Sequence, residues 1–333
     1  MKNIAINGFG RIGRIAFREI FGAANYKVVA INSQSSPEEL AYLLKYDTVH
    51  GNYDVEGITF NEEGIIVDGE LIRTFIINEA KNCPWGELNV DLVLECTGIY
   101  TTEEKAMEHI EAGAKHVIIS APGKGNIKTI VYGVNHQTLD GTEKIISAAS
   151  CTTNCLAPVI KVINDNIGIS SGFMTTIHAY TNDQATMDGV HSKGIASRRG
   201  RAAAQNIIPA STGAAKSIGE VIPEVRGKLD GVSFRVPVID GSCIDLTLNL
   251  VREVSAEEIN KILLNNVNEV LKFTYDPVVS SDIIGNPCGA LIDGKCTKVL
   301  NSNKKLVKIV AWYDNEYGYT VQMLRTMQVL LNK

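Results

Sequence analysis

The sequence INGFGRIG, at residues 6–13, is the strongest indication of how the N-terminal part of this chain folds. It lies between a predicted strand over 2–6 and a predicted helix over 11–22. Its glycines have the spacing GxGxxG, and they are Gly8, Gly10 and Gly13. In a dinucleotide-binding turn they allow the tight turn, the close approach of backbone to pyrophosphate, and the contact between helix and strand. Because glycines also mark ordinary turns, the strand-turn-helix context is what favours a dinucleotide site.

Further alternation of strands and helices extends this unit into a parallel sheet. Apolar runs predict strands over 28–31, 92–96 and 116–120, and helical spacing predicts a helix over 103–112. Buried parallel strands covered by helices have this pattern. We therefore expect one open α/β domain of the Rossmann type at the N-terminal end.

The pattern changes after Cys151, where longer alternating stretches are separated by fewer helices. These stretches span residues 172–178, 232–238, 244–251 and 305–312. They predict a second, α+β domain with a mixed or antiparallel sheet. The polar segment 181–200 has a length typical of functional or disordered loops. A last helix is predicted over 318–331.

Composition limits the class of protein. The net charge of −5 argues against broad binding to nucleic acid, although a local arginine cluster can still bind a small anion. The N-terminus does not resemble a signal peptide, and no apolar run reaches the roughly 20 residues of a membrane span, so we expect a cytoplasmic protein without a membrane partner. The seven cysteines and six histidines lack metal-ligand spacing, so we expect free thiols and no metal site.

The sequence SCTTNCLAP, at 150–158, predicts the beginning of a helix with Ser150 as its cap. Cys151 would lie in the first turn, where the positive helix end favours the nucleophilic thiolate. By itself a cysteine in this place is more often structural, and Cys155 fits a small buried residue. His178, at the end of an apolar strand, is a candidate base for Cys151.

Two regions predict binding of anions. Arginines lie among small residues at 196–204, and small hydroxyl residues precede a predicted helix in PASTGAAK at 209–216. Arg235 lies within an apolar strand, where a charge is costly unless it faces a ligand or a partner. A subunit contact or a solvated loop is an equal alternative for these arginines.

The adenosine end of the predicted cofactor site lacks its usual acidic residue. The fingerprint places a carboxylate for the ribose about 20 residues after the glycines, but residues 32–36 read NSQSS. This absence removes the usual repulsion of a 2′-phosphate, yet no basic residue in the stretch attracts one. We expect Asn32 and Ser33 to bind the ribose of NAD, with use of NADP left open.

Seven motifs together resemble phosphorylating glyceraldehyde-3-phosphate dehydrogenases. In chain order they are INGFGRIG, KYDTVHG, AGAKHVIISAP, ASCTTNCLAP, HAYTNDQ, RVPV and WYDNEYGY. The resemblance covers residue 3 to the last helix. The chain departs from the family at Ser33, where an aspartate is common, at Asn78 and at Val190.

The resemblance implies an NAD-binding domain at 1–149 with a returning segment at 313–333, a catalytic domain at 150–312, and a homotetramer. It implies that Cys151 is the nucleophile and His178 its base. The implied site for inorganic phosphate consists of Ser150, Thr152, Thr212 and Gly213. The implied site for the C3 phosphate of the substrate consists of Thr181 and Arg235, with Arg199 close to both. Further implied cofactor contacts are Arg11, Ile12, Thr97, Ser120 and Asn315.

The implied reaction oxidises glyceraldehyde 3-phosphate with inorganic phosphate to 1,3-bisphosphoglycerate, in glycolysis or gluconeogenesis. Cys151 forms a thiohemiacetal, His178 accepts the hydroxyl proton, and phosphate attacks the resulting thioester. Three alternatives are an erythrose-4-phosphate dehydrogenase, a non-catalytic nucleotide-binding or adhesion protein, and a cysteine hydrolase. The intact HAYTNDQ favours the triose substrate, and the glycine fingerprint disfavours the hydrolase.

Overall fold

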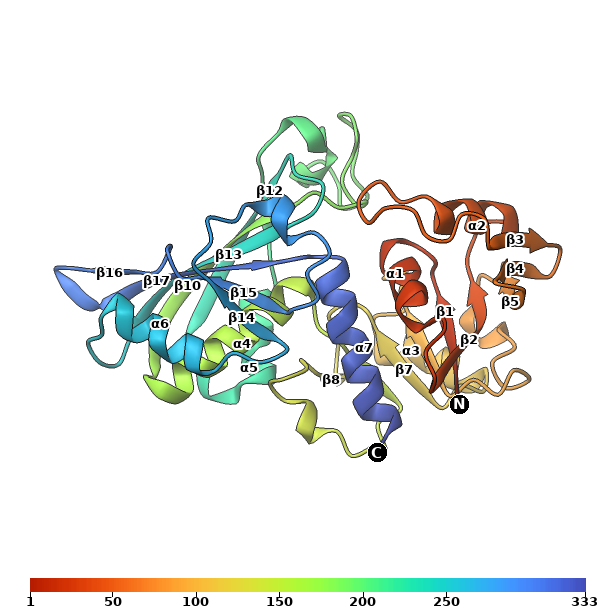
Figure 1. The fold of residues 1–333 in the computed structure, drawn as a ribbon, viewed down its shortest axis with the longest axis horizontal. Coiled ribbons are helices and arrows are strands. Elements are labelled where there is room, and N and C mark those ends of the chain that lie inside the picture. The colour runs from red at the N-terminus through yellow and green to blue at the C-terminus, as the bar shows by residue number, and fades with distance from the viewer. The chain divides into compact units, whose positions relative to one another are not determined.

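The computed structural model describes all of Met1–Lys333 and divides the chain into two compact units. The first unit consists of Met1–Ile130, His136–Ala149 and Met323–Lys333, and the second consists of Val131–Asn135 and Ser150–Gln322. Figure 1 shows both units as ribbons. None of the helices combines the length and the apolar character needed to cross a bilayer.

The first unit is built on a nine-stranded sheet with the order β3-β4-β5-β2-β1-β6-β7-β9-β8. Its neighbouring strands are parallel except for the antiparallel pairs β3–β4 and β4–β5. The strands are β1 (Lys2–Asn7), β2 (Tyr26–Asn32), β3 (Ile58–Asn61), β4 (Gly64–Val67), β5 (Glu70–Phe75), β6 (Leu92–Glu95), β7 (His116–Ile119), β8 (Lys128–Thr129) and β9 (Ile145–Ser147). The predicted parallel sheet is confirmed.

Both faces of this sheet are buried. Ile4 and Ile6 of β1 belong to one apolar cluster, whereas Ala5, between them, belongs to a second cluster. Alternation of this kind places successive side chains on opposite faces, and each face therefore has its own core. The helices of this unit are α1 (Arg11–Ile20), α2 (Pro37–Lys45), α3 (Glu103–Glu111) and the short η1 (Ala80–Asn82) and η2 (His136–Thr138).

The second unit contains an eight-stranded mixed sheet with the order β11-β12-β10-β13-β17-β15-β14, in which β16 pairs with β17. The pairs β10–β12 and β14–β15 are parallel and the others are antiparallel. The strands are β10 (Ile169–Ala179), β11 (Ile208–Ser211), β12 (Leu229–Val236), β13 (Ser242–Leu250), β14 (Leu271–Thr274), β15 (Ala290–Asp293), β16 (Lys298–Leu300) and β17 (Asn303–Tyr313). The predicted mixed sheet is confirmed.

Three helices pack on this second sheet and on one another, and Figure 1 shows them on one side of it. They are α4 (Cys151–Asn166), α5 (Ala214–Val221) and α6 (Ala256–Asn265), and the short helices are η3 (Arg198–Gly200), η4 (Ala203–Gln205), η5 (Pro223–Val225) and η6 (Ser280–Ile283). The last helix is α7 (Tyr317–Leu331), and its residues from Met323 onward belong to the first unit.

Most predicted element ends differ from the structure by one to three residues, and two of these differences have a clear local cause. Helix α1 ends at Ile20 rather than at Gly22, because Phe21 is extended and Gly22 has a φ of +79°. Strand β12 ends at Val236 rather than at 238, because Pro237 has no N–H group to donate to a neighbouring strand.

Candidate active site

The glycine turn of the first unit joins β1 to α1, and its three glycines meet three different surroundings. Gly8 has a φ of +94°, and a Cβ there would lie 2.8 Å from backbone atoms of Cys96 and Thr97. A Cβ on Gly13 would lie 2.2 Å from the carbonyl oxygen of Gly8. A Cβ on Gly10 would meet no atom within 4 Å. Gly8 and Gly13 therefore permit packing, and Gly10 leaves space beside the helix N-terminus.

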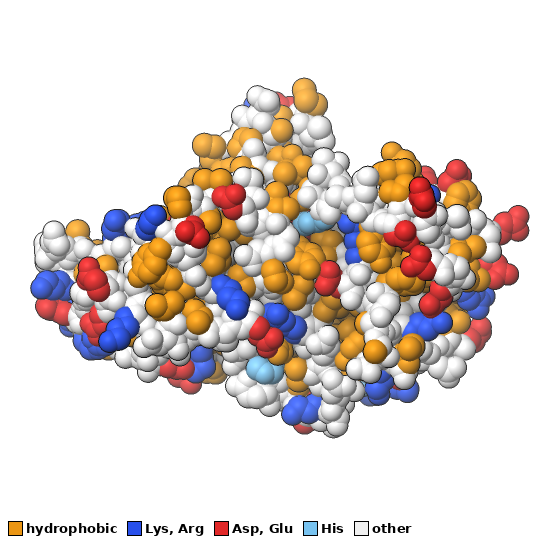
Figure 2. Space-filling view, in the orientation of Figure 1, with side chains coloured by type: hydrophobic (Ala, Val, Ile, Leu, Met, Phe, Trp, Pro, Cys, Tyr) orange, Lys and Arg blue, Asp and Glu red, His pale blue; other side chains and the backbone are white.

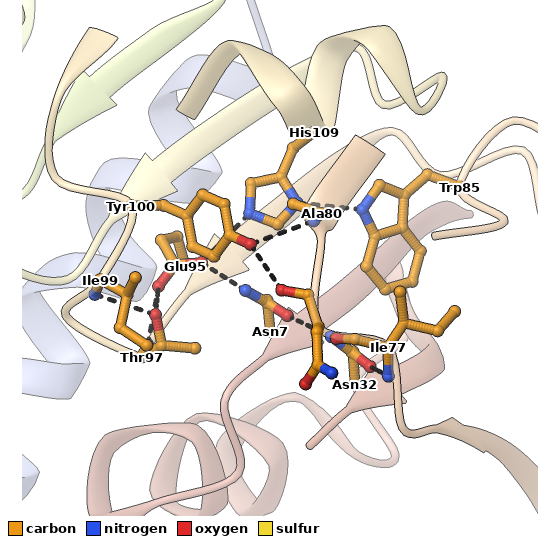
Figure 3. Close-up of polar contacts among 11 residues, drawn as sticks. Asn7, Asn32, Ile77, Ala80, Trp85, Glu95, Thr97, Ile99, Tyr100 and His109 are labelled. Carbon is orange, nitrogen blue, oxygen red and sulfur yellow. Dashed lines mark hydrogen bonds and ion pairs between the residues drawn. The ribbon is translucent and has the colours of Figure 1, made fainter. Parts of the chain in front are cut away.

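The Asn32 side chain, at the end of β2, makes its hydrogen bonds with other protein groups rather than facing the expected ribose site. Its side chain is buried, because its amide nitrogen donates to Asn7 Oδ1 at 2.8 Å and to the carbonyl of Ile77 at 2.9 Å. Its amide oxygen accepts the N–H of Ile77 at 2.9 Å. These bonds occupy the Asn32 amide with protein partners (Figure 3). Ser33, which is only partly buried, is the next polar side chain along the chain.

The Arg11 side chain, at the start of α1, is paired with Asp47 at 2.6 Å. Burial opposes ionisation of Asp47, but hydrogen bonds from His50, Arg11 and Val49 lower the pKa of Asp47 to about 2. The Arg11 guanidinium is thus held by a carboxylate of the same unit.

Thr97 and Ser120 follow the carboxyl ends of β6 and β7, which are adjacent parallel strands. Thr97 donates its N–H to Glu95 at 2.7 Å, and its hydroxyl also donates to that carboxylate. Ser120 donates its N–H to the carbonyl of Glu95 at 2.9 Å. Ligands of open α/β sheets bind at this edge, so both residues lie where the fold places a cofactor.

In the second unit, Ser150 caps α4 as predicted, because its hydroxyl accepts the N–H of Thr153 at 3.1 Å. Cys151 occupies the first turn of α4, and its Sγ lies 3.3 Å from Nε2 of His178. Cys155, one turn further along, is fully buried. The prediction that Cys155 is a small buried residue is confirmed.

His178 is held in place by the pairing of β10 with β12, in which it is the register partner of Arg235. Its Nδ1 lies 2.7 Å from the carbonyl of Ala179 and 3.0 Å from Nη1 of Arg235. These neighbours require opposite tautomers, because the carbonyl accepts and the guanidinium donates. The carbonyl is closer, and Arg235 also donates to Ala179 and Thr181. We therefore assign the proton to Nδ1, which leaves Nε2 to accept the thiol proton of Cys151.

Burial affects the ionisation of both Cys151 and His178. Burial raises the pKa of the Cys151 thiol, and Arg235 and hydrogen bonds with Thr152 offset only part of that rise. Burial, followed by the charge of Arg235, lowers the pKa of His178 to about 3. Loss of hydration thus opposes the charged form of each group, whereas the helix end and the 3.3 Å contact between the two side chains favour the charged forms.

The first turns of α4 and α5 lie side by side. Thr153 and Ser217, one on each helix, are joined by a 3.3 Å hydroxyl contact. Thr212 accepts the N–H of Ala214 at 3.2 Å, and a Cβ on Gly213 would meet no atom within 4 Å. Two neighbouring helix N-termini with space beside them suit an anion.

Thr181 and Arg199 are brought together by Asp183, which sequence reasoning missed. The Thr181 hydroxyl and the Arg199 guanidinium both bind its carboxylate, and Arg235 donates to the Thr181 hydroxyl at 3.1 Å. Burial opposes ionisation of Asp183, but Thr181 and Arg199 lower its pKa below the ordinary value. Asp183 lies within HAYTNDQ, so its position two residues after Thr181 was the available signal.

Tyr313 is a second residue that sequence reasoning missed. It is buried, and its hydroxyl lies 2.9 Å from those of Thr152 and Thr176. Its ring meets the His178 ring edge to face, with centroids 5.8 Å apart. A tyrosine inside an apolar strand, directly before Asp314, was the only signal, and it did not identify these partners.

Asn315 is buried near the same strand, and Ser242 fixes its side chain. The Ser242 hydroxyl donates to Asn315 Oδ1 at 2.6 Å and accepts the N–H of Ala179 at 3.0 Å. Because Oδ1 of Asn315 accepts this bond, the other polar atom of its amide is the nitrogen, which donates hydrogen bonds.

Comparison with known proteins agrees with this geometry. Residues 2–103 match the family model "Glyceraldehyde 3-phosphate dehydrogenase, NAD binding domain", and residues 150–315 match the model of the C-terminal domain of the same family. The chain is 52% identical to a glyceraldehyde-3-phosphate dehydrogenase of Clostridium pasteurianum, over 98% of both chains. It is 49% identical to one of Streptococcus pyogenes, over 98% of this chain and 97% of the other. With a matching NAD-binding region and a cysteine-histidine pair in the matching C-terminal region, the chain belongs to the glyceraldehyde-3-phosphate dehydrogenase family.

Proposed function

We propose that this chain is an NAD-dependent phosphorylating dehydrogenase that oxidises glyceraldehyde 3-phosphate to 1,3-bisphosphoglycerate. The observation that supports this most strongly is the 3.3 Å contact between Cys151 Sγ and His178 Nε2 at the first turn of a helix. In this proposal residues 1–149 and 313–333 form the NAD-binding domain, and residues 150–312 form the catalytic domain. The reaction serves glycolysis or gluconeogenesis.

Cys151 and His178 perform the covalent chemistry of the proposed reaction. Nε2 accepts the thiol proton as sulfur bonds to the aldehyde carbon, and it returns that proton to the former carbonyl oxygen, which gives a thiohemiacetal. Nε2 then takes the proton of the new hydroxyl group as hydride leaves the carbon, and the product is a Cys151 thioester. When bound, NAD supplies the acceptor for the hydride that leaves this carbon. Attack by inorganic phosphate breaks the carbon-sulfur bond, and the thiolate regains a proton from His178.

The two phosphates of this reaction need two anion sites. The adjacent first turns of α4 and α5, with Ser150, Thr152, Thr212 and Gly213, are proposed to bind inorganic phosphate. Thr181 and Arg235 are proposed to bind the C3 phosphate, and their 3.1 Å contact supports a shared site. Arg199, which the Asp183 carboxylate links to Thr181, is proposed to lie close to both phosphate sites.

The residues present fit NAD, because the glycine turn has open space only where a pyrophosphate has to approach, at Gly10. Gly8 and Gly13 shape the turn, and the backbone N–H groups of Arg11 and Ile12 are proposed to bind the pyrophosphate. Further proposed cofactor contacts are Ser33, Thr97, Ser120 and Asn315. With Ser33 in place of a carboxylate, we propose that NADP is also accepted, more weakly than NAD.

The functional test is a rate measurement with each reactant withheld in turn. NADH is expected to accumulate at turnover only when glyceraldehyde 3-phosphate, NAD and phosphate or arsenate are all present. A full rate without phosphate would contradict the phosphorylating reaction, and faster turnover of erythrose 4-phosphate would favour that sugar as substrate. Initial rates with NAD and NADP at equal concentration test the choice of cofactor.

A homotetramer is also proposed, and exposed apolar side chains support it. Met187, Val190 and Ile195 are 76%, 90% and 98% exposed, and all lie in the 181–200 segment. Figure 2 shows hydrophobic side chains on the segment that Figure 1 draws in green. Clusters of this kind favour burial against another copy. Sedimentation equilibrium gives the mass, and a monomer at assay concentration would contradict the tetramer.

A further inference from the structure

Three neighbouring strands of the first unit end in buried polar residues that are bonded to one another. Asn32, Asn7 and Glu95 end β2, β1 and β6, and they are register partners across the sheet. Asn32 donates to Asn7 at 2.8 Å, and Asn7 donates to Glu95 at 2.5 Å. All three are at most 5% exposed. Side chains that are buried this deeply in parallel strands are usually apolar, so this row of three polar side chains needs an explanation.

The row continues from Glu95 to His109 of α3 and to Trp85, as Figure 3 shows. The Trp85 indole N–H lies 3.0 Å from His109 Nδ1, and His109 Nε2 lies 3.1 Å from Glu95. An indole nitrogen only donates, so Nδ1 has to accept, and the ring proton has to be on Nε2. Trp85 thereby fixes one neutral tautomer of His109, which donates to Glu95.

Glu95 receives hydrogen bonds from Asn7, His109 and both polar groups of Thr97. Both Glu95 oxygens therefore face hydrogen-bond donors, which is the arrangement that suits a carboxylate. His109 is its only ion-pair partner, and the tautomer above leaves that ring neutral. A fully buried carboxylate without a neighbouring cation lowers the stability of the fold. Residues that lower stability in this way are typical of functional sites.

What Glu95 holds is the turn that follows β6. Thr97 is bound to the carboxylate, and the Thr97 hydroxyl accepts the N–H of Ile99 at 3.0 Å. The backbone of Cys96 and Thr97 lies against Gly8, leaving no room for a Cβ there. Any shift of this turn therefore moves the glycine turn that approaches the pyrophosphate.

A second segment is supported from the same cluster. The Tyr100 ring packs against His109 with centroids 5.2 Å apart. Its hydroxyl donates to the carbonyl of Asn78 at 2.9 Å and accepts the N–H of Ala80 at 3.1 Å. Asn32, at the other end of the row, binds both backbone groups of Ile77. Residues 77–80 and 96–99 are thus held by one connected set of bonds.

We propose that Glu95 is a positioning residue for the NAD site and that it acts through Thr97 and Asn7. Trp85 fixes the tautomer of His109, so that Nε2 of His109 always donates a hydrogen bond to Glu95. This inference rests on the proposed use of NAD. It predicts an effect on cofactor affinity that is separate from the chemistry at Cys151.

The first test is Glu95→Gln. The side-chain NH2 group of glutamine donates hydrogen bonds, so it would face the N–H donors of Asn7 and His109 and leave them without an acceptor. The dissociation constant of NAD is expected to rise about tenfold. The KM for glyceraldehyde 3-phosphate and the kcat at saturating NAD are expected to stay within about twofold of wild type, because the residue does not act on the second unit's chemistry. The exposed Glu87→Gln is the matched control and keeps wild-type affinity. An unchanged dissociation constant in Glu95→Gln would overturn the proposal.

The second test uses Trp85→Phe in the Glu95→Gln background. Without the indole N–H, His109 can move its proton to Nδ1 and accept from the new glutamine. The double variant is therefore expected to bind NAD more tightly than Glu95→Gln alone. Equal or weaker binding would refute the tautomer argument.

The third measurement does not depend on either variant folding. Nitrogen-15 NMR of the wild-type His109 ring at neutral pH is expected to show a bare Nδ1 and a protonated Nε2. A protonated Nδ1 would overturn the inference. A wild-type chain that fails to bind NAD would instead contradict the proposed function, so the two failures are distinguishable.

Discussion

Replacing Gly10 by alanine separates cofactor binding from folding. A Cβ at this position meets no protein atom within 4 Å, and the backbone is extended with a negative φ of −76°, so it does not require glycine's left-handed region. Gly10 is the N-cap of α1 and contributes no side-chain bond. The free energy of unfolding is therefore expected to fall by about 1 kcal/mol or less.

The same methyl group would stand in the space left for the pyrophosphate. Forcing one extra carbon into a filled site costs about 1–3 kcal/mol, which corresponds to a rise of about fivefold to 150-fold in the dissociation constant of NAD. Isothermal titration calorimetry measures that constant, and urea denaturation measures the stability of the same preparation.

Gly13→Ala is the matched comparison, because its Cβ would lie 2.2 Å from the Gly8 carbonyl oxygen and 3.1 Å from Ile6. The chain has to move by about 1 Å to relieve these contacts, so a loss of about 1–3 kcal/mol of stability is expected. The reasoning would be refuted if Gly10→Ala bound NAD like the wild type, or if it lost as much stability as Gly13→Ala.

Further variants test the two units separately. Alkylation of Cys151 by iodoacetamide is expected to accelerate through the alkaline range, because its pKa is raised, and a rate that is already constant at neutral pH would contradict this. The pKa of His178 falls from 6.5 to about 3 on folding, so between these pH values the unfolded chain binds a proton that the folded chain does not. The free energy of unfolding should therefore decrease as pH falls from 6.5 toward 3. His178→Asn should flatten that profile in acid denaturation. Tyr313→Phe removes a hydroxyl shared by two buried threonines and should cost about 1–3 kcal/mol in thermal unfolding, with a lower kcat. Ser33→Asp should reduce the rate with NADP by at least about tenfold and leave the rate with NAD nearly unchanged; equal losses with both cofactors would contradict the placement of Ser33.

Local signals predicted much of the fold. The glycine spacing identified the turn between β1 and α1, and Ser150 identified the start of α4, because caps and turns depend on residues only a few positions apart. The alternation of apolar residues identified β10, β12, β13 and β17, because each buries one face more than the other. Their ends were less certain, as the end of β12 before Pro237 shows.

Partners distant in sequence were not predictable in the same way. Asn32 fitted a ribose contact by its position after β2, but the side chain is used by Asn7 and Ile77, which only the sheet register brings near. Cys151 and His178 were paired from their chemistry and from the family resemblance. Their 3.3 Å contact depends on how α4 packs on β10, and no local pattern specifies that packing.

Protonation at Cys151 depends on long-range packing for the same reason. Arg235 attracts a thiolate at Cys151, but it repels an imidazolium at His178, and it therefore gives little net support to an ion pair of the two. Burial opposes the charged form of both groups. The 3.3 Å contact places Nε2 to take the thiol proton while the carbon-sulfur bond forms. A helix N-terminus read from sequence predicts only one of these contributions, because burial, Arg235 and the contact itself all depend on how distant segments pack.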